Sequence, residues 1–244
     1  MMDVLLIHGL SGSTADMQFI GDSLGGTGQR VINIGLPGHG TRPEDLLAVR
    51  MQEWIDAAAA GIDACPQGCF IVGQSMGALL ALYGAVRYPG RVRGLALLAP
   101  AIRLSGGFNR LFMSLLHAYA MVLPVPSLYY TKANGADIAD PAAKDHYGAY
   151  NKIAFNALVQ FERLRRLVLK LLPGVCVPVL TVSSVNDHTI ARNAVEIIDR
   201  KIGSTIKKNV VFSGSFHVLS VDRDKEGVVA SILEFQRFIK TGVI

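Results

Sequence analysis

The sequence predicts an α/β fold with a mostly parallel sheet of about six strands, flanked by helices. Short apolar runs recur along the chain, and continuous runs of Val, Ile and Leu are typical of strands buried on both faces of a parallel sheet. Longer stretches with a helical pattern separate most of these runs. Strands and helices that alternate in this way form a parallel sheet through right-handed crossovers, with helices on both faces.

The elements follow in chain order. The first predicted strand is the apolar run at residues 4–7, and the second carries Val31, Ile32 and Ile34. The remaining predicted strands cover residues 70–73, 94–99, 177–183 and 209–213. Helices are predicted at residues 15–24, 51–64, 75–88, 191–201 and 225–240.

The alternation stops between residues 102 and 173, where no run is convincing as a strand. We expect two or three helices there, inserted after the fourth predicted strand. An insertion at the carboxyl end of a strand lies on the side where open α/β sheets bind ligands, so this segment is a candidate lid. The predicted organisation is an α/β core at residues 1–101 and 174–244 with a helical cap at residues 102–173. The apolar side chains of the cap would line a pocket, pack on the core, or do both.

The composition excludes several classes of protein. Half of the 244 residues are hydrophobic and 18% are charged, which excludes a disordered or coiled-coil chain. The net charge of +5 is mild and no basic stripe interleaves with aromatics, so we expect no nucleic-acid partner. Apolar stretches are interrupted before the ~18–20 residues that a membrane span needs, so we expect no stable membrane insertion. The basic residues within 161–172 predict a solvated helix face, with weak contact to an anionic membrane surface as the alternative.

The three cysteines predict reduced, mostly structural thiols, because the chain is large enough to fold without disulfides. The N-terminus shows no basic region and no cleavage site of a signal peptide, and we therefore expect a cytoplasmic protein. No histidines lie near the cysteines at metal-ligand spacing, and we expect neither a metal nor a cofactor. A homodimer is left open.

Residues 73–77, Gly-Gln-Ser-Met-Gly, form a G-x-S-x-G sequence between a predicted strand and a predicted helix. A serine on this sharp turn is held clear of the sheet, and glycines on either side leave room for the crossing backbones. The turn also places the serine at a helix N-terminus, which favours developing negative charge. The alternative is an ordinary Gly-rich turn. The flanking strand and helix favour Ser75 as a nucleophile.

A serine hydroxyl needs a base to take its proton, and the base needs a third group to orient it. In hydrolases with this turn, an acid and then a histidine follow the serine along the chain. His217, just past the last predicted strand, is the expected base. Asp187, in the turn that leaves the fifth predicted strand, is the expected acid, with a helix N-terminal acid as the alternative. All three would meet at the same carboxyl edge of the sheet.

The other histidines are given lesser roles. His8 and His39 precede Ser75 and lie in Gly-rich turns, where a structural role is expected. His117 and His146 fall in the insertion, and His188 is expected to flank the acid.

The oxyanion of a tetrahedral intermediate needs two backbone donors. One is expected to be the N–H of Met76, which follows the nucleophile, and the other an N–H of the loop after the first strand. We assign the second donor to Leu10, although a neighbour in the same loop would also fit.

Five motifs together resemble the serine-hydrolase branch of the α/β-hydrolase superfamily, and most of all the bacterial carboxylesterase and monoacylglycerol lipase-like group. The motifs lie at residues 8–12, 36–40, 73–77, 186–190 and 216–219. The resemblance spans residues 3–100 and 177–240 and is weaker over the insertion. Two features depart from the group: Phe216 stands where a Gly is usual, with Gly214 as a candidate compensation, and the chain begins at what resembles the third strand of the full fold.

The resemblance implies an α/β-hydrolase fold and a carboxylic ester hydrolase that works through an acyl-enzyme at Ser75. The apolar insertion favours a small to medium apolar acyl ester, such as a monoacylglycerol, as the partner molecule. The same residues also cleave thioesters, amides or C–C bonds in related folds, and this alternative stays open. A binding protein that keeps the fold without catalysis is the least favoured interpretation.

Overall fold

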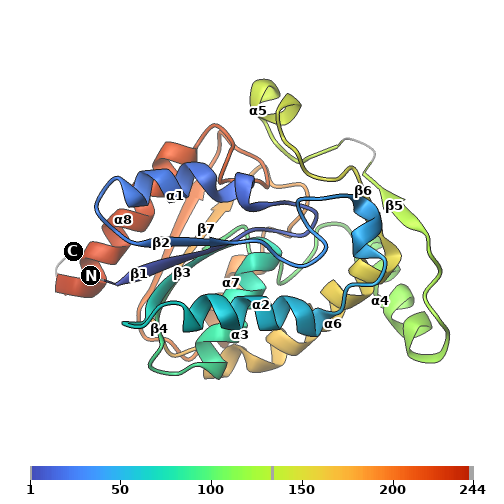
Figure 1. The fold of residues 1–244 in the computed structure, drawn as a ribbon, viewed down its shortest axis with the longest axis horizontal. Coiled ribbons are helices and arrows are strands. Elements are labelled where there is room, and N and C mark those ends of the chain that lie inside the picture. The colour runs from blue at the N-terminus through green and yellow to red at the C-terminus, as the bar shows by residue number, and fades with distance from the viewer. Residues whose placement is uncertain (1, 133–134, 242–244) are drawn as a thin grey trace.

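The computed structural model describes residues 2–132 and 135–241 and is built around a six-stranded sheet in the order β2-β1-β3-β4-β7-β8 (Figure 1). Every neighbouring pair of strands in this sheet is parallel. Helices cover both faces, so the predicted fold class is confirmed. The predicted cap and C-terminal core segment include residues 133–134 and 242–244, and the predicted N-terminal core includes residue 1, all of which lie outside the described residues.

Each predicted strand and helix of the core is present, with ends that differ by three residues or fewer. The strands are β1 (Asp3–Ile7), β2 (Val31–Ile34), β3 (Cys69–Gln74), β4 (Val92–Leu98), β5 (Tyr129–Thr131), β6 (Lys152–Ala154), β7 (Val179–Ser184) and β8 (Lys207–Phe212). The α-helices are α1 (Gln18–Gly25), α2 (Met51–Asp63), α3 (Met76–Arg87), α4 (Gly107–Val122), α5 (Pro141–Asp145), α6 (Phe155–Leu171), α7 (Ala194–Lys201) and α8 (Lys225–Thr241). The 3₁₀ helices are η1 (Thr14–Met17), η2 (Pro43–Leu46) and η3 (Leu172–Gly174).

The central strands are mostly apolar because both of their faces are covered. Every residue of β1 and β3 is buried, whereas residues of the edge strand β8 alternate between exposed and half-buried. This contrast is the expected one for a parallel sheet with helices on both faces.

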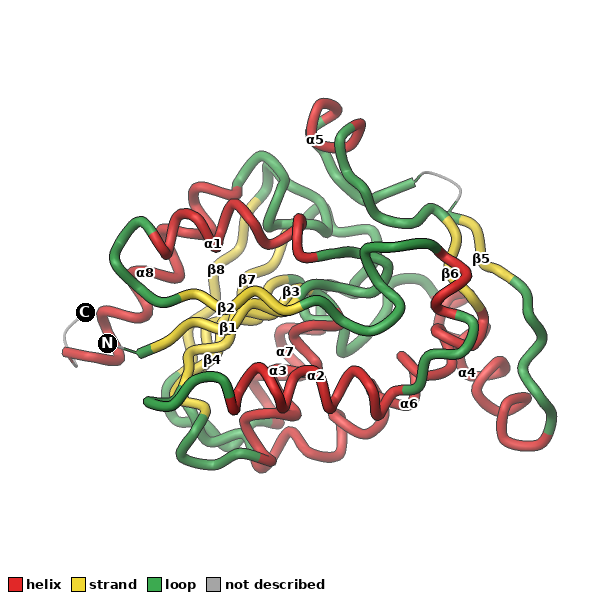
Figure 2. Tube along the Cα trace, viewed as in Figure 1, coloured by secondary structure: helices red, strands yellow, loops and turns green. Residues whose placement is uncertain are grey.

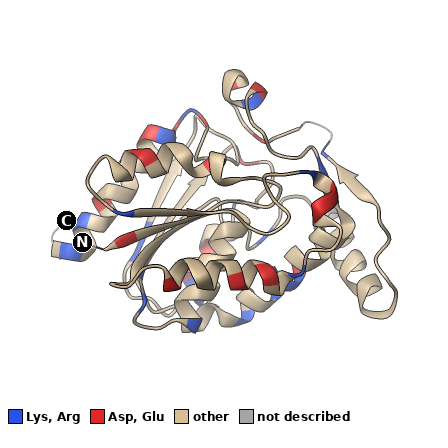
Figure 3. Ribbon diagram, in the orientation of Figure 1, with Lys and Arg blue, Asp and Glu red and all other residues tan. Residues whose placement is uncertain are grey.

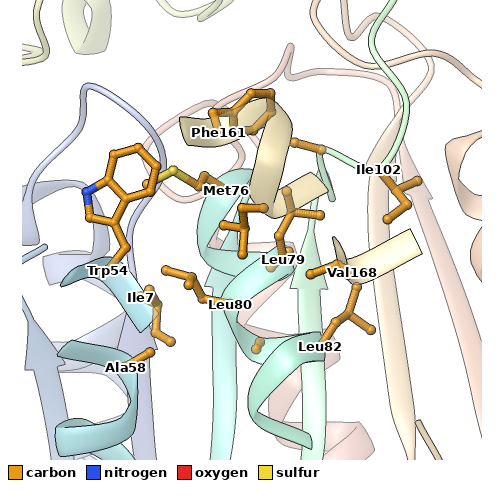
Figure 4. Packing of buried hydrophobic residues seen from close by; sticks show 14 of the residues in the cluster. Ile7, Trp54, Ala58, Met76, Leu79, Leu80, Leu82, Ile102, Phe161 and Val168 are labelled. Carbon is orange, nitrogen blue, oxygen red and sulfur yellow. The ribbon is translucent and has the colours of Figure 1, made fainter. Parts of the chain in front are cut away.

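Two apolar layers hold the sheet. One layer joins α1 and α8 to one face, and the other joins α2, α3, α6 and α7 to the opposite face. Figure 4 shows α3 side chains packed between Trp54 and Ala58 of α2 and Phe161 and Val168 of α6. The helix α6 therefore belongs to the core packing, although it lies within the insertion between β4 and β7.

The insertion contains two short strands as well as helices. β5 and β6 pair as an antiparallel ribbon, so the expectation that no strand lies between residues 102 and 173 was wrong. Each strand has only three residues, and β5 is largely exposed, so neither forms the buried apolar run on which the sequence prediction depends. The three helices α4, α5 and α6 agree with the expected number.

The order of the sheet reverses between β1 and β3. The connection that leaves β1 runs to α1 on one face, while the connection that leaves β3 runs to α3 on the other. Such a reversal is where open α/β sheets bind ligands, outside the carboxyl ends of the strands. Figure 2 shows long loops gathered at this edge.

The turn between β3 and α3 is unusually tight. A Cβ atom on Gly77 would lie 2.0 Å from the carbonyl oxygen of Ile7, and a Cβ on Gly73 would lie 2.4 Å from that of Gly77. No side chain fits at either position without a shift of backbone, so both glycines are required for α3 to cross so close to β1 and β3.

Gly77→Ala is therefore expected to destabilise the protein by about 3 kcal/mol or more, because the added methyl group must displace the backbone of β1. Urea unfolding would measure the loss. Gly25→Ala is the matched control, since a Cβ at the end of α1 meets no atom within 4 Å. Equal stability of the two variants would show that the close crossing imposes no constraint.

Candidate active site

Ser75 occupies the turn between β3 and α3 with φ 55° and ψ −106°. A non-glycine residue rarely adopts a positive φ, and such strain persists only where the surroundings enforce it. Here the Ser75 N–H donates to the carbonyl of Leu98 at 2.8 Å, and the Ser75 carbonyl accepts from the N–H of Ala101 at 3.3 Å. The backbone of the turn is thus fixed by the end of β4 and by the loop that follows it.

Three predicted side chains meet at the carboxyl edge of the sheet. His217 Nε2 lies 2.9 Å from Ser75 Oγ, and His217 Nδ1 lies 2.8 Å from Asp187 Oδ2. Ser75 follows β3, Asp187 follows β7 and His217 follows β8. The arrangement forms a continuous hydrogen-bonded chain from the hydroxyl to the carboxylate.

The turn after β7 fixes the second oxygen of Asp187. Its Oδ1 accepts from the backbone N–H groups of Thr189 at 2.8 Å and Ile190 at 2.7 Å. With Oδ1 held by the backbone, Oδ2 is left to accept from the imidazole. Asp187 is therefore oriented by its own turn.

Burial and charge act in opposite directions on this pair. Burial alone would raise the pKa of Asp187, but the neighbouring His217 and the N–H groups of Ile190 and Thr189 outweigh it and lower that pKa. Burial alone would lower the pKa of His217, but the Asp187 carboxylate outweighs it, with Asp137 adding to the effect, and the pKa is raised. The Asp187 carboxylate thus stabilises an imidazolium formed at His217.

The loop after β1 runs directly against the serine. A Cβ atom on Gly9 would lie 3.3 Å from Ser75 Cβ and 3.9 Å from its Oγ. Leu10 follows Gly9 in this loop, and Met76 is the first residue of α3. Both predicted oxyanion donors therefore belong to segments that adjoin Ser75.

His8 and His39 lie apart from this chain. The fully buried His8 donates from Nδ1 to the carbonyl of Gly9 at 2.9 Å and accepts at Nε2 from the N–H of Leu36 at 3.1 Å. His39 donates from Nδ1 to the carbonyl of Pro37 and packs edge-on against Trp54. Burial lowers the pKa of each ring to about 4, with His8 contributing to the shift at His39. Both are neutral parts of the packing.

His188 has a different partner from His217. Its Nδ1 lies 2.8 Å from Asp137 Oδ1, and its ring packs edge-on against Phe216 at 4.7 Å between centroids. Phe216 needs no glycine-like backbone, since positive φ among the described non-glycine residues occurs only at Ser11, Ser75 and Ala99. The Phe at this position therefore packs on the acid turn without distorting the histidine loop.

Two further residues contact His217 and were not predicted. The buried Gln74 donates from Nε2 to the His217 carbonyl at 3.0 Å, and the Asp137 carbonyl accepts from the His217 N–H at 3.0 Å. Gln74 stands at a variable position of G-x-S-x-G, and Asp137 lies in the polar part of the insertion. Neither position carries a signal in a single sequence.

The described part of the chain holds no cluster of three or more His, Cys, Asp or Glu side chains suited to a metal ion. Cys65 and Cys69 are buried thiols and Cys176 is an exposed one. Within residues 2–132 and 135–241, no helix combines the length and apolar character that crossing a membrane requires.

Comparison with known proteins assigns the family. A family model described as serine aminopeptidase, S33, matches residues 2–224. The chain belongs to this family. The thermostable monoacylglycerol lipase of Bacillus sp. (strain H-257) is similar to it, with 30% identity over 242 residues that cover 95% of this chain and 89% of that lipase.

Solved structures agree with this family. A structure described under the metagenome-derived lipolytic enzymes LipS and LipT superposes with a TM-score of 0.86 and 28% identity, covering 97% of this chain and 93% of that one. The monoacylglycerol lipase of Paleococcus ferrophilus gives a TM-score of 0.82 with the same coverage, and at 18% identity it bears on the fold alone. The matches confirm an α/β-hydrolase enzyme of the lipase and esterase group and support ester hydrolysis as its general reaction.

The neutral, buried His8 predicts a loss of stability in acid. Its pKa is about 4 in the folded protein against 6.5 for a histidine in water, so the unfolded chain binds a proton that the folded chain excludes. Well above pH 6.5 His8 is neutral in both states, and its titration does not affect the free energy of unfolding. As the pH falls from 6.5 towards 4, protonation of His8 in the unfolded chain lowers the free energy of unfolding by up to about 3 kcal/mol.

His8→Gln should therefore lose less free energy of unfolding than the wild type between pH 7 and pH 4.5, as measured by urea titration at each pH. His146→Gln, a change on an exposed ring, is the control and should follow the wild type. An identical loss in all three proteins would contradict the role given to His8.

Proposed function

We propose that the chain is a serine-dependent carboxylic ester hydrolase in which Ser75 is the nucleophile, His217 the general base and Asp187 the orienting acid. The observation that carries the proposal is the hydrogen-bonded chain from Ser75 Oγ through His217 to Asp187, with contacts of 2.9 and 2.8 Å. A hydroxyl, a base and an orienting carboxylate in this geometry are the parts that acyl transfer requires.

The reaction follows from the geometry. Ser75 Oγ attacks the ester carbonyl carbon while His217 Nε2 takes the hydroxyl proton, and Asp187 stabilises the imidazolium that results. The tetrahedral intermediate collapses as His217 returns the proton to the leaving alcohol, which leaves an acyl group on Ser75. Water, activated by the same imidazole, then releases the acid. Apart from the ester and water, the chain's own residues supply every reacting group in these steps, so the proposed reaction needs no cofactor.

The negative oxygen of the intermediate lies at the start of α3 in this proposal. The N–H groups of Leu10 and Met76 donate to it, supported by the closeness of the Gly9 loop to Ser75. The N-terminal end of α3 adds its positive dipole at the same point.

The insertion supports an apolar substrate. Residues 111–131 contain no Asp, Glu, Lys or Arg, and the ribbon from α4 to β5 is drawn there in tan in Figure 3. Several of its large apolar side chains are exposed: Leu111, Leu115, Tyr119, Met121, Val122, Leu123, Leu128 and Tyr130. We assign residues 102–173 as a cap, whose helix α6 also packs against the core, and a small to medium apolar acyl ester as the substrate. A monoacylglycerol is the leading candidate, in agreement with the name of the Bacillus relative.

Ser75→Ala should lower kcat by roughly 10⁴–10⁶ with the fold intact, because the nucleophile is lost while the turn is kept. Ester turnover would measure the loss of kcat, and a fluorophosphonate probe would show whether the nucleophile is still present. Circular dichroism would check the fold. Ser23→Ala on α1 is the control and should label and turn over as the wild type does. A wild-type protein that does not label would favour a binding protein on this fold.

The substrate class is tested with p-nitrophenyl esters from acetate to laurate, a monoacylglycerol, a thioester and an aminoacyl anilide. We expect kcat/KM to be highest for esters of medium chain length, because the uncharged stretch at residues 111–131 suits an apolar acyl chain. Negligible ester turnover beside strong turnover of the thioester or the anilide would contradict the ester assignment and support the alternative bond class.

A further inference from the structure

The polar half of the insertion, residues 135–150, is hydrogen-bonded into the loops of the active site. It reaches the loop after β1 through the Tyr150 N–H, which donates to the Ser11 carbonyl at 3.1 Å. It reaches η1, which follows that loop, through the Tyr147 hydroxyl, which donates to Asp16 at 2.8 Å. On the other side, the buried Asp222 accepts from the N–H groups at 139 and 140 and from Phe216 N–H in the histidine loop. The segment thus bridges separate loops of the core.

Within this segment, the Asp137 side chain is bound to the turn that carries Asp187. Its Oδ2 accepts from the His188 N–H and from the Thr189 hydroxyl, both at 3.0 Å, and its Oδ1 lies 2.8 Å from His188 Nδ1. The carboxylate is 18% exposed, so most of it is removed from competing water. Since His188 and Thr189 directly follow Asp187, these contacts fix the position of the turn.

The backbone of Asp137 is bound to the loop that carries His217. Its carbonyl accepts from the N–H groups of His217 at 3.0 Å and Val218 at 3.2 Å. From the other side, Gln74 donates to the His217 carbonyl. The peptide of His217 is therefore held between the insertion and the residue that precedes Ser75.

We propose that Asp137 is a positioning residue that ties the Asp187 turn to the His217 loop and so keeps the carboxylate and the imidazole in hydrogen-bonding register. The proposal deepens, and rests on, the function proposed for the same site. Asp137 touches neither the reacting hydroxyl nor a ring nitrogen of His217, whose two nitrogens lie against Ser75 and Asp187. It acts through the residues that carry those groups, from a part of the chain that the sequence assigns to a cap.

The charge of Asp137 gives the proposal a second readout. The groups that face the His217 imidazole are Asp187 on the turn after β7, Ser75 after β3, and Asp137 and Lys132 on the insertion. Asp137 raises the pKa of His217, whereas the ammonium of Lys132 lowers it. Catalysis needs the neutral imidazole, so removing the charge of Asp137 should move the acid limb of kcat/KM to lower pH.

Two variants separate the effect of the hydrogen bonds of Asp137 from the effect of its negative charge. Asp137→Ala removes the side-chain contacts and should lower kcat on the order of 10- to 100-fold with little change in KM, because a small misplacement of the base is costly. Asp137→Asn keeps an oxygen for the His188 N–H and the Thr189 hydroxyl, and its amide can donate to His188 Nδ1. It should keep kcat within roughly threefold of wild type and shift only the acid limb.

The direct measurement is the low-field proton NMR signal of the His217 Nδ1–H that donates to Asp187. We expect this signal to broaden or shift in Asp137→Ala. The fraction of protein molecules that a fluorophosphonate labels should equal that of the wild type, which shows that the variant is folded. Glu44→Ala is the matched control: Glu44 pairs with Lys152 at 2.9 Å across another contact between core and insertion, and both side chains are exposed. The control should leave the NMR signal and kcat unchanged.

An Asp137→Ala protein with the wild-type NMR signal and wild-type kcat would overturn the proposal. Where Asp137→Ala does not fold, Thr189→Val removes one contact to Asp137 and should weaken the same signal, and an unchanged signal there would also overturn it. The signal needs no turnover. Absence of ester hydrolysis by the wild type would therefore refute the proposed function while the NMR comparison still decides the role of Asp137.

Discussion

The close crossing of α3 over β1 and β3 is the constraint on which the site depends. Gly73 and Gly77 let these backbones approach to a distance that no Cβ would allow. The chain then reverses so sharply that Ser75 is held at a positive φ, with its N–H bound to the last residue of β4 and its carbonyl bound to the loop that follows. The strain at Ser75 is offset by the packing of α3 between two other helices, which makes the turn rigid.

A rigid turn is useful only if the other side chains reach it from elsewhere in the chain. Ser75 and His217 are 142 residues apart, yet the parallel sheet brings the ends of β3, β7 and β8 to one edge. The sheet fixes where each loop begins and leaves the path of the loop free. Around the histidine loop, hydrogen bonds with Gln74, which donates, and with Asp137 and Asp222, which accept, restrict that remaining freedom. The side chains of the site are thus positioned in two stages, first by the strands and then by the hydrogen bonds of the loops.

These two stages explain what a single sequence can predict. Runs such as Val4–Ile7 in β1 and the glycines around Ser75 carry strong local signals, so the strands and the elbow can be predicted together with the order of Asp187 and His217. Gln74 and Asp137 carry none, since each is recognisable only by a partner that the fold brings near. The ribbon of β5 and β6 escapes prediction for the same reason, because three-residue strands depend on pairing with each other.

The hydrogen bonds also divide the insertion into two parts with different mechanical properties. Residues 135–150 are bound to the loops after β1, β7 and β8, and a cap that opened as one body would break these contacts, each worth roughly 1 kcal/mol, and would displace His217. Movement confined to α4 and the stretch up to β5 would leave them intact. That stretch is the uncharged one with exposed apolar side chains. If the uncharged stretch is the part of the proposed cap that admits substrate, access to Ser75 and the position of His217 would depend on different parts of the insertion and would be separable.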